Sequence, residues 1–576
     1  MKGAFPYLIR QSVRNWSILR LRQLRSPRYL VALVLGLGYL WAVLAQRHSS
    51  SPPGGPMPGP WLETLGGLGI AVAVAWSWLF GVERRALAFS PAEVTLLFTA
   101  PVTRRWLIQY KLLRNQLLIL LNVVLWTALL PGEGGGGSSL RRAVSVWVLL
   151  TTLSLHRLGA SFVRTSLGEH GRFGLRRRAG SLFLGTTLLL GLAWTTRDAF
   201  SALLAGWGRG LGGLITALEA VAASPVPHLL LLPFVTMVRP LTAPSGAAWA
   251  HALIPALFFL VAHFVWVVRS DSAFEEAAAD ASLHRAREIG SRGVAPAVPR
   301  LAHRRVPALL TLGPSGWPAG AVLWKNLIAV ARTRRAREVT GLFLVAGGAM
   351  ILITFFGDAR LADAVGWLAV MWAGVLVVVG PQWVRNDLRN DLLMLDVLRS
   401  YPLRGRSVVA AEVAASSAVL TAAQLGLLGV AYLAFLGSRE MELGLLSRTL
   451  LLLGTAIYLP GINYAGMLIQ NGAALLFPAW VHLGAGRPGG VEALGQSMLM
   501  TIVLAAALAL VLLAPTLLGA GVFLLLDSLM GLGAIVPATV GFVIVLAGEI
   551  AFMVRWLGAI LERTEPLTVA FVHALG

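Results

Sequence analysis

Runs of about 20 apolar residues recur along this 576-residue chain, and no other feature limits its fold as strongly. An α-helix of about 20 residues is long enough to cross the hydrocarbon core of a bilayer. Only 13% of the residues are charged, and the mean hydropathy is +0.74, which is outside the range of soluble domains of this length. The sequence therefore predicts an all-α polytopic membrane protein.

The apolar runs predict about 12 transmembrane helices, half of them in each half of the chain. In the first half the predicted spans are Tyr29–Ala45, Gly66–Val82, Gln116–Leu130, Ala143–Phe162, Ser181–Thr195 and Ala247–Val268. In the second half they are Val339–Phe356, Ala362–Gly380, Val408–Leu436, Thr449–Leu468, Met498–Leu517 and Val536–Gly558. One long hydrophilic stretch, Arg269–Glu338, separates the two sets. We expect a first transmembrane half over residues 1–268, a cytoplasmic linker over 269–320 and a second half over 321–576.

The net charge of +22 comes mainly from arginine, because the chain has only three lysines, Lys2, Lys111 and Lys325. Roughly four fifths of the 48 basic residues fall in loops or span ends on the same side as Met1. The positive-inside rule then places both termini in the cytoplasm, with membrane lipid as the immediate surroundings. The same dispersion over short loops, with no recognisable binding module, argues against nucleic acid as a partner. The chain has no cysteine, so it has neither disulfides nor thiolate sites.

The two halves resemble each other in sequence. Residues 14–36, RNWSILRLRQLRSPRYLVALVLG, align without a gap with residues 325–347, KNLIAVARTRRAREVTGLFLVAG. Further on, LLFTAPVTRRWL aligns with VLRSYPLRGRSV, which pairs Pro101 with Pro402. Each half thus begins with a basic amphipathic surface helix, followed by two spans, a proline-stopped cytoplasmic helix and four more spans. The pattern predicts two tandem six-helix repeats, an arrangement that is common among transporters.

The first proline-stopped helix lies within the charged segment Glu83–Arg114. Ser90 is a suitable N-cap, Pro91 fits the first helical position, and Glu93 completes a capping box. Ala100-Pro101 ends the helix after a short apolar stripe of Val94, Leu96, Leu97 and Phe98. An interfacial helix lying on lipid headgroups is the alternative interpretation of this segment alone. Recurrence at the equivalent place in the second half favours a docking role.

Two stretches, FSPAEVTLLFTAPVTRRWLIQYKLL (Phe89–Leu113) and NGAALLFPAWVHLG…PGGVEALGQ (Asn471–Gln496), resemble a family of bacterial ABC exporter permeases. These are relatives of the type 2 exporters of the ATP-binding-cassette superfamily. The resemblance implies six-span units, each with an amphipathic elbow helix before its first span and a coupling helix between its second and third. It also implies an extracellular re-entrant region before the last span of each half. The elbow helices would be Pro6–Arg28 and Ala321–Arg337, and the re-entrant regions Thr196–Gly246 and Leu518–Ile535.

The coupling helices are the sites where ATPase subunits would dock. In the first half the implied docking residues are Ser90, Glu93, Leu96, Leu97, Phe98 and Pro101, and in the second Asp391, Met394, Val397 and Pro402. A usual permease of this superfamily has one six-span unit and dimerises, whereas here both halves are fused in one chain. Such a chain would form the translocation pathway between its own halves.

The chain has no G-x-x-x-x-G-K-[ST] phosphate loop, so it has no nucleotide-binding motif of its own. We therefore expect no catalytic or cofactor residues here, and place ATP and its magnesium ion on separate cytoplasmic ATPase subunits, of which two are expected. No His, Asp or Glu cluster has metal-ligand spacing.

A few polar residues interrupt the spans. Glu549 is an ionisable group at membrane depth, where it is either a proton or substrate site, or forms an interhelical hydrogen bond or a pair with Arg555. Asn122 and Asn463 are expected to form interhelical hydrogen bonds. Lys111 and Glu412 occupy equivalent positions in the two repeats; we expect their side chains to extend to the membrane interface, with an ion pair between the halves as the alternative.

These observations predict the membrane subunit of an ATP-driven exporter in the cytoplasmic membrane of a bacterium, with an unknown substrate. A secondary active transporter with two repeated halves is the first alternative, and it would carry functional acidic residues in several spans. An integral-membrane enzyme acting on lipid-linked substrates is the second, and it would show clustered His, Asp or Glu at one membrane face. A membrane scaffold that transports nothing also remains open.

Overall fold

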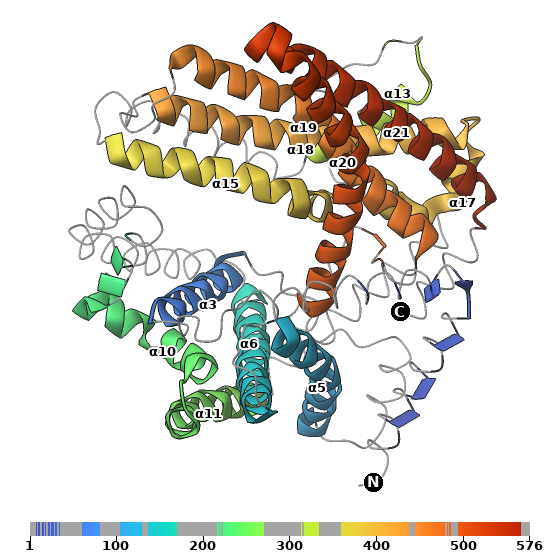
Figure 1. Ribbon diagram of the computed structural model, residues 1–576. Helices are drawn as coiled ribbons and strands as arrows, with labels where there is room; N and C mark the ends of the chain where they lie inside the picture. Colours follow the sequence, from blue (N-terminus) through green and yellow to red (C-terminus); the bar gives the residue numbers. More distant parts are fainter. Residues whose placement is uncertain are drawn as a thin grey trace. The chain divides into compact units, whose positions relative to one another are not determined.

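The computed structural model describes residues 60–80, 104–129, 136–169, 223–269, 316–332, 359–436, 444–478 and 494–565. It also describes isolated residues between 7 and 38, between 213 and 220, and at 313, 481, 483 and 484. All regular secondary structure in these ranges is helical (Figure 1). The prediction of an all-α chain is therefore confirmed for the residues that the structure describes.

Seven helical stretches among the described residues are long and apolar enough to cross a membrane. They are Ser139–Ala160, Gly246–Arg269, Ala362–Ser400, Gly405–Leu436, Leu445–Leu476, Ser497–Met530 and Ile535–Arg563. Two further predicted spans contain shorter apolar helices, Leu62–Ala71 and Leu112–Ala128. The other three, Tyr29–Ala45, Ser181–Thr195 and Val339–Phe356, lie wholly or largely outside the described residues. The chain is thus a multi-pass helical membrane protein, and the number of about 12 spans stays a prediction.

The chain divides into two compact units. Unit 1 comprises residues 1–303 together with 489–497, and unit 2 comprises residues 304–488 together with 498–576. The division after His303 falls within the predicted linker 269–320. That the units are two copies of one repeat stays a prediction.

Unit 1 contains five described helices that pack against one another. They are α3 (Pro60–Phe80), α5 (Arg104–Leu129), α6 (Gly136–Glu169), α10 (Pro225–Thr242) and α11 (Gly246–Arg269). Helix α6 packs against α5, α10 and α11, and α3 packs against α10. Gly67 lets α3 approach α10 closely, since a Cβ there would lie 2.7 Å from the side chain of Val235. A buried apolar cluster joins α5 to α6 through Ile119, Val123, Val146 and Leu150.

One predicted boundary in unit 1 differs from the structure, and one predicted region contains a described helix. Helix α5 starts at Arg104, well before the predicted span start at Gln116, so the basic end of the charged segment Glu83–Arg114 continues directly into this helix. Helix α10 lies within the predicted re-entrant region Thr196–Gly246, and continues through Pro233 and Pro240.

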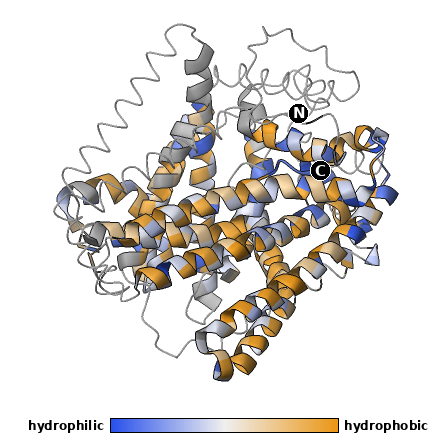
Figure 2. Ribbon diagram, turned by 90° about the horizontal axis from the view of Figure 1, so that it is seen from above, coloured by the Kyte–Doolittle hydropathy of each residue, from blue (hydrophilic) through white to orange (hydrophobic). Residues whose placement is uncertain are grey.

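Unit 2 is organised around α18. Its long helices are α15 (Ala359–Trp383), α18 (Gly405–Leu436), α19 (Leu445–Leu476), α20 (Leu494–Met530) and α21 (Ile535–Arg563), with the short α13 (Gly320–Arg332) beside them. Helix α18 packs against α13, α15, α19 and α21, and consequently has many buried residues (Figure 1). Two glycines allow the closest approach: a Cβ on Gly405 would lie 2.4 Å from the backbone oxygen of Gly558 on α21. Figure 2 shows that the long helices are apolar over most of their length.

The predicted span end at Leu517 was wrong. Helix α20 continues to Met530, with Pro515 inside it, and a short 3-10 turn, η3 (Gly531–Ala534), joins it to α21. Gly531 adopts a φ of 54°, which an L side chain rarely tolerates, and this conformation reverses the chain. The segment Leu518–Ile535, which the resemblance implies as an extracellular re-entrant region, consists of the end of α20, the turn η3 and the first residue of α21.

Candidate functional site

The segment between α15 and α18 folds as three short helical pieces, which we call the connector (Leu388–Ser400). These are α16 (Leu388–Asp391), η1 (Leu392–Met394) and α17 (Leu395–Ser400). Asp387 caps the connector, because its side-chain Oδ1 accepts a hydrogen bond from the backbone N–H of Arg389 at 3.1 Å. Tyr401 follows the connector, and its extended backbone (ψ 136°) is the conformation favoured before a proline, here Pro402. The implied docking residues Asp391, Met394 and Val397 of the second coupling helix lie within these bounds.

The connector carries apolar side chains on two faces. Its buried face consists of leucines at helical spacing, Leu388, Leu392, Leu395 and Leu398, which pack into the core formed with α18, α19 and α21. Its other face is exposed and also apolar: Met394 and Val397 are each 46% exposed, and Tyr401 just beyond is 50% exposed. Asp396 and Arg399 lie exposed beside them. An exposed apolar face of this kind, on a short helix whose other face is already packed in the core, is typical of a site that contacts another molecule.

A buried ion pair fixes the start of the connector. The Asp387 and Arg389 residues are 1% and 2% exposed, and the guanidinium binds the carboxylate through two bonds, Nε to Oδ1 at 2.9 Å and Nη2 to Oδ2 at 2.6 Å. Asp387 Oδ2 also accepts a hydrogen bond from Nδ2 of Asn471 on α19, at 3.1 Å. With the backbone N–H of Arg389, the carboxylate accepts four hydrogen bonds, which is its full capacity.

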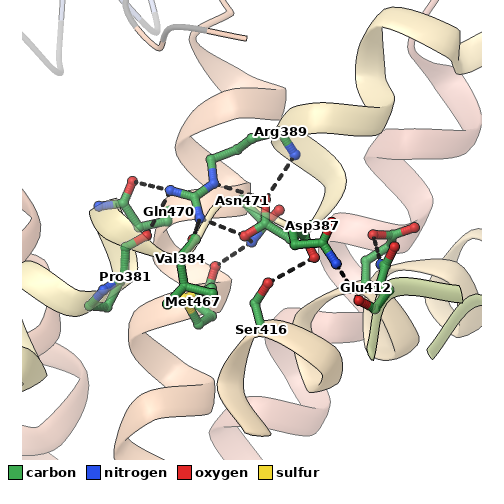
Figure 3. A network of polar contacts seen from close by, with 11 residues as sticks. Pro381, Val384, Asp387, Arg389, Glu412, Ser416, Met467, Gln470 and Asn471 are labelled. Atoms are coloured by element: carbon green, nitrogen blue, oxygen red, sulfur yellow. Dashed lines mark hydrogen bonds and ion pairs between the residues drawn. The ribbon is translucent and has the colours of Figure 1, made fainter. Parts of the chain in front are cut away.

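The remaining guanidinium donors of Arg389 satisfy the end of α15 (Figure 3). Its Nη1 donates to the backbone oxygen of Pro381 at 2.7 Å and to Oε1 of Gln470 at 3.4 Å, and its Nη2 donates to the backbone oxygen of Val384. The last carbonyls of a helix have no partner within the helix, so Arg389 acts as a side-chain cap for α15. All five of its N–H groups are used. One amide atom on each of Gln470 and Asn471 has no partner.

A second cluster joins the connector to α13 and α18. Lys325 of α13 forms ion pairs with Asp391 of the connector and, at 3.5 Å, with Glu412 of α18. Asn326 donates a hydrogen bond from Nδ2 to Glu412 Oε2 at 2.5 Å. Burial lowers the pKa of Lys325, but its hydrogen bond to Asp391 and the charges of both carboxylates outweigh this, so the pKa is raised above its ordinary value. Lys325 is therefore a cation at neutral pH.

The interface position predicted for Glu412 was wrong. Its side chain is fully buried, and its partners are Lys325 and Asn326 on the short helix α13. The physical reason is that α13 lies against α18 and supplies a cation and an amide at the depth of this carboxylate, so there is no need to reach the headgroups. The equivalent Lys111 has no described side chain.

Further bonds tie the same end of unit 2 together. Asn386, just before the connector, donates to the backbone oxygen of Asn326 at 2.6 Å, and its own backbone oxygen accepts a bond from Ser416 Oγ at 2.9 Å. On α21, Glu562 accepts a hydrogen bond from the backbone N–H of Gly405, and its backbone oxygen accepts one from Arg399. The connector is thus bound to α13, α15, α18, α19 and α21. We call this set of bonds around Asp387, Arg389, Lys325, Asp391 and Glu412 the anchoring network.

Of the predicted docking residues, those of the second half are described. Met394, Val397 and Pro402 are exposed, whereas Asp391 is half-buried and paired with Lys325. Ser90, Glu93, Leu96, Leu97, Phe98 and Pro101 lie outside the described residues. Asp387, Arg389 and Lys325 were not predicted as site residues, although the run N-D-L-R-N-D shortly after a predicted span was a signal for a capped, ion-paired turn.

The three predicted intramembrane polar residues differ from one another. Asn463 of α19 donates to Thr421 Oγ1 at 2.8 Å and to Gln424 Oε1 at 2.6 Å, both on α18, which are interhelical bonds of the expected kind. Asn122 donates to the backbone oxygen of Leu118 within its own helix. Glu549 of α21 has a buried carboxylate oxygen, Oε2, with no hydrogen-bond partner. Among the described residues, this atom therefore forms neither the expected interhelical hydrogen bond nor the expected pair with Arg555.

A polar chain in unit 1 was also missed. Trp78 Nε1 lies 3.1 Å from Nε2 of His156, whose Nδ1 lies 3.1 Å from Nε2 of His263, whose Nδ1 lies 2.7 Å from the backbone oxygen of Phe259. Because an indole N–H only donates, His156 Nε2 is the acceptor in the first bond of this chain. The chain joins α3, α6 and α11.

Among the described residues, no group of three or more His, Cys, Asp or Glu is arranged to hold a metal ion. Comparison with protein-family models, with curated proteins and with solved structures finds no significant match to this chain. The fold and the polar sites are those of a helical multi-pass membrane protein with a firmly anchored, partly exposed connector.

Proposed function

We propose that this chain is the transmembrane permease subunit of an ATP-driven exporter, and that a cytoplasmic ATPase subunit docks on the exposed face of the connector. The observation that carries the proposal is the combination of an uncovered apolar face, Met394, Val397 and Tyr401, with a fully satisfied ionic anchor beneath it. Methionine, tyrosine and arginine are also the residue types enriched at protein–protein interfaces.

The anchoring network supports a mechanical role for this face. A buried ion pair with complete hydrogen bonding resists displacement, because separating its members leaves a charge unpaired in a low-dielectric site. A force applied to Val397 would therefore move α15, α18 and α19 together with the connector instead of bending it. Rigid-body switching of a transporter needs such a stiff link between its energy source and its spans.

The sequence adds two supports to the proposal. The connector lies in a segment that the distribution of basic residues assigns to the cytoplasm, where ATP is available. The chain also has no phosphate loop, so an ATP-driven mechanism requires a partner. The cytoplasmic membrane of a bacterium is the location that follows from the family resemblance.

The test is co-purification of a tagged chain from its native cells in gentle detergent, with the associated proteins identified by mass spectrometry. We expect an ATPase with a phosphate-loop sequence to accompany the natural chain. The double variant Met394→Asp plus Val397→Asp places charges at the centre of the contact, and recovery of the ATPase should fall at least about tenfold, since 1.4 kcal/mol corresponds to a factor of ten in binding.

Met530→Asp is the matched control. Met530 is 53% exposed and lies at the turn between α20 and α21, which is the end of these helices opposite to the connector. It should retain the ATPase at the natural level. Equal loss in both variants, or full retention in the double variant, would contradict docking on the connector. The absence of any ATPase, even after cross-linking in intact membranes, would overturn the exporter assignment.

A secondary active transporter is the runner-up, and one observation favours it. Glu549 has a carboxylate oxygen without a partner in the middle of a candidate span, as a proton-coupled carrier would require. This alternative predicts transport that persists without any ATPase and stops when the proton gradient is abolished.

A further inference from the structure

In unit 2, a groove lies between α20 and α21. It has a volume of about 380 Å³ and is lined by Leu510 and Val511 of α20 and by Gly548, Glu549, Phe552 and Met553 of α21. Five of these residues are apolar and one is a carboxylate. Its volume is in the range of sites that hold small organic molecules.

Glu549 lies halfway along the candidate span Ile535–Arg563. At 1.5 Å per residue, it is about 20 Å from either end of the helix. Lipid headgroups occupy the interface at the two ends, so their charged groups do not reach this depth. The counter-charge for Glu549 therefore has to come from elsewhere.

The described surroundings supply no such counter-charge. Glu549 Oε2 is buried and accepts no hydrogen bond, in contrast to the four bonds that Asp387 accepts. A carboxylate at membrane depth is stable only when it is neutralised by a proton or paired with a cation. Next to an apolar groove, a cation with an apolar body satisfies both the charge and the walls.

We propose that this groove binds an amphipathic monovalent cation, with the Glu549 carboxylate as its counter-ion and the side chains of Leu510, Phe552 and Met553 around its apolar body. The inference rests on the proposed function in one respect: it names hydrophobic cations as the substrate class of the permease. The binding itself needs neither ATP nor a partner.

The experiment measures equilibrium binding of tetraphenylphosphonium to the purified full chain in phosphatidylcholine nanodiscs, with binding to empty nanodiscs subtracted. Tetraphenylborate, an anion of the same shape, is the charge control. We expect the natural chain to bind the phosphonium and to show no protein-dependent binding of the borate. Glu549→Gln keeps the size and polarity of the side chain but removes its charge, and should weaken phosphonium binding at least tenfold.

Two further variants separate the charge from the groove. A Cβ added at Gly548 meets no atom within 4 Å, so Gly548→Leu should fold normally, fill the groove and weaken phosphonium binding to a similar extent. Asp527→Asn removes another carboxylate of the same helix pair, on the exposed surface of α20 and outside the groove, and should leave binding unchanged. Elution in size-exclusion chromatography confirms that each variant is folded.

Phosphonium binding by Glu549→Gln at the natural level would overturn the counter-ion role. Natural binding by Gly548→Leu would overturn the groove as the site, and equal binding of the borate would show that only hydrophobicity is recognised. Failure of the exporter assignment gives a different result: phosphonium binding remains dependent on Glu549 while no ATPase associates with the chain.

Discussion

Asp387 and Glu549 are two carboxylates of unit 2 with opposite surroundings. Asp387 accepts four hydrogen bonds, two of them from the guanidinium of Arg389, and connects α15, α19 and the connector. Glu549 faces an apolar groove, and its buried oxygen has no partner. The difference shows how to distinguish charges that hold this fold together from charges that are available to a ligand. Hydrogen-bond satisfaction separates them, whereas position in the sequence does not.

Loss of the Asp387 charge should produce the largest effect on stability. In Asp387→Asn, the new amide NH₂ faces donors of Arg389 or Asn471, and the guanidinium is left buried without its counter-ion. Breaking a buried ion pair in this way costs about 3–5 kcal/mol of unfolding free energy. Thermal unfolding in detergent, followed by tryptophan fluorescence, should show a large decrease in the midpoint.

Asp396→Asn is the matched control, because Asp396 is an exposed carboxylate on the same connector. Its effect on unfolding free energy should stay within about 0.5 kcal/mol. Equal midpoints for the two variants would contradict an anchoring role for Asp387.

The second network cluster should have a smaller, cooperative effect. Glu412→Gln and Lys325→Met each remove one member of this cluster, and in Glu412→Gln the lysine keeps a second carboxylate, Asp391. In a double-mutant cycle we expect a coupling free energy of about 0.5–3 kcal/mol between them. Additive effects would show that the two side chains act independently, and would contradict a cooperative cluster.

Glu549→Gln should have the smallest effect on stability. Since the carboxylate oxygen has no protein partner to lose, the change should leave the unfolding free energy within about 0.5 kcal/mol of the natural value, or raise it. The same chemical change, a carboxylate to its amide, is thus expected to destabilise strongly at position 387 and hardly at 549. A loss of several kcal/mol at 549 would mean that Glu549 is a structural residue, and would break the comparison.

Helix positions were predictable where apolar periodicity was uninterrupted. The spans predicted at Ala362–Gly380 and Val536–Gly558 correspond to α15 and α21 with ends that differ by a few residues. For α19, the predicted end at Leu468 is too early, because the polar residues Gln470 and Asn471 interrupt the apolar run. In the structure both side chains are buried and hydrogen-bonded to Arg389 and Asp387, which the sequence alone does not show. For α20, the predicted end at Leu517 is also too early, because the helix continues through Pro515 to Met530.

The anchoring network could not be predicted, because its members are distant in sequence. Asn471 binds Asp387 across 84 residues, and Lys325 reaches Glu412 across 87. Which charges pair across such separations depends on how the helices pack, and hydropathy carries no information about that. The local part was accessible: Asp387 two residues before Arg389, followed by leucines at helical spacing, is a capping signal.

The docking role of the connector is tested most directly by identifying what its exposed face contacts in the cell. A photo-cross-linking amino acid placed at Val397, with Met530 as the comparison site, would capture that neighbour in intact membranes. We predict that Val397 forms an adduct with an ATPase subunit and that Met530 does not. Adducts of Val397 with lipid alone would contradict the docking role, and would identify the connector as a helix lying on the membrane surface.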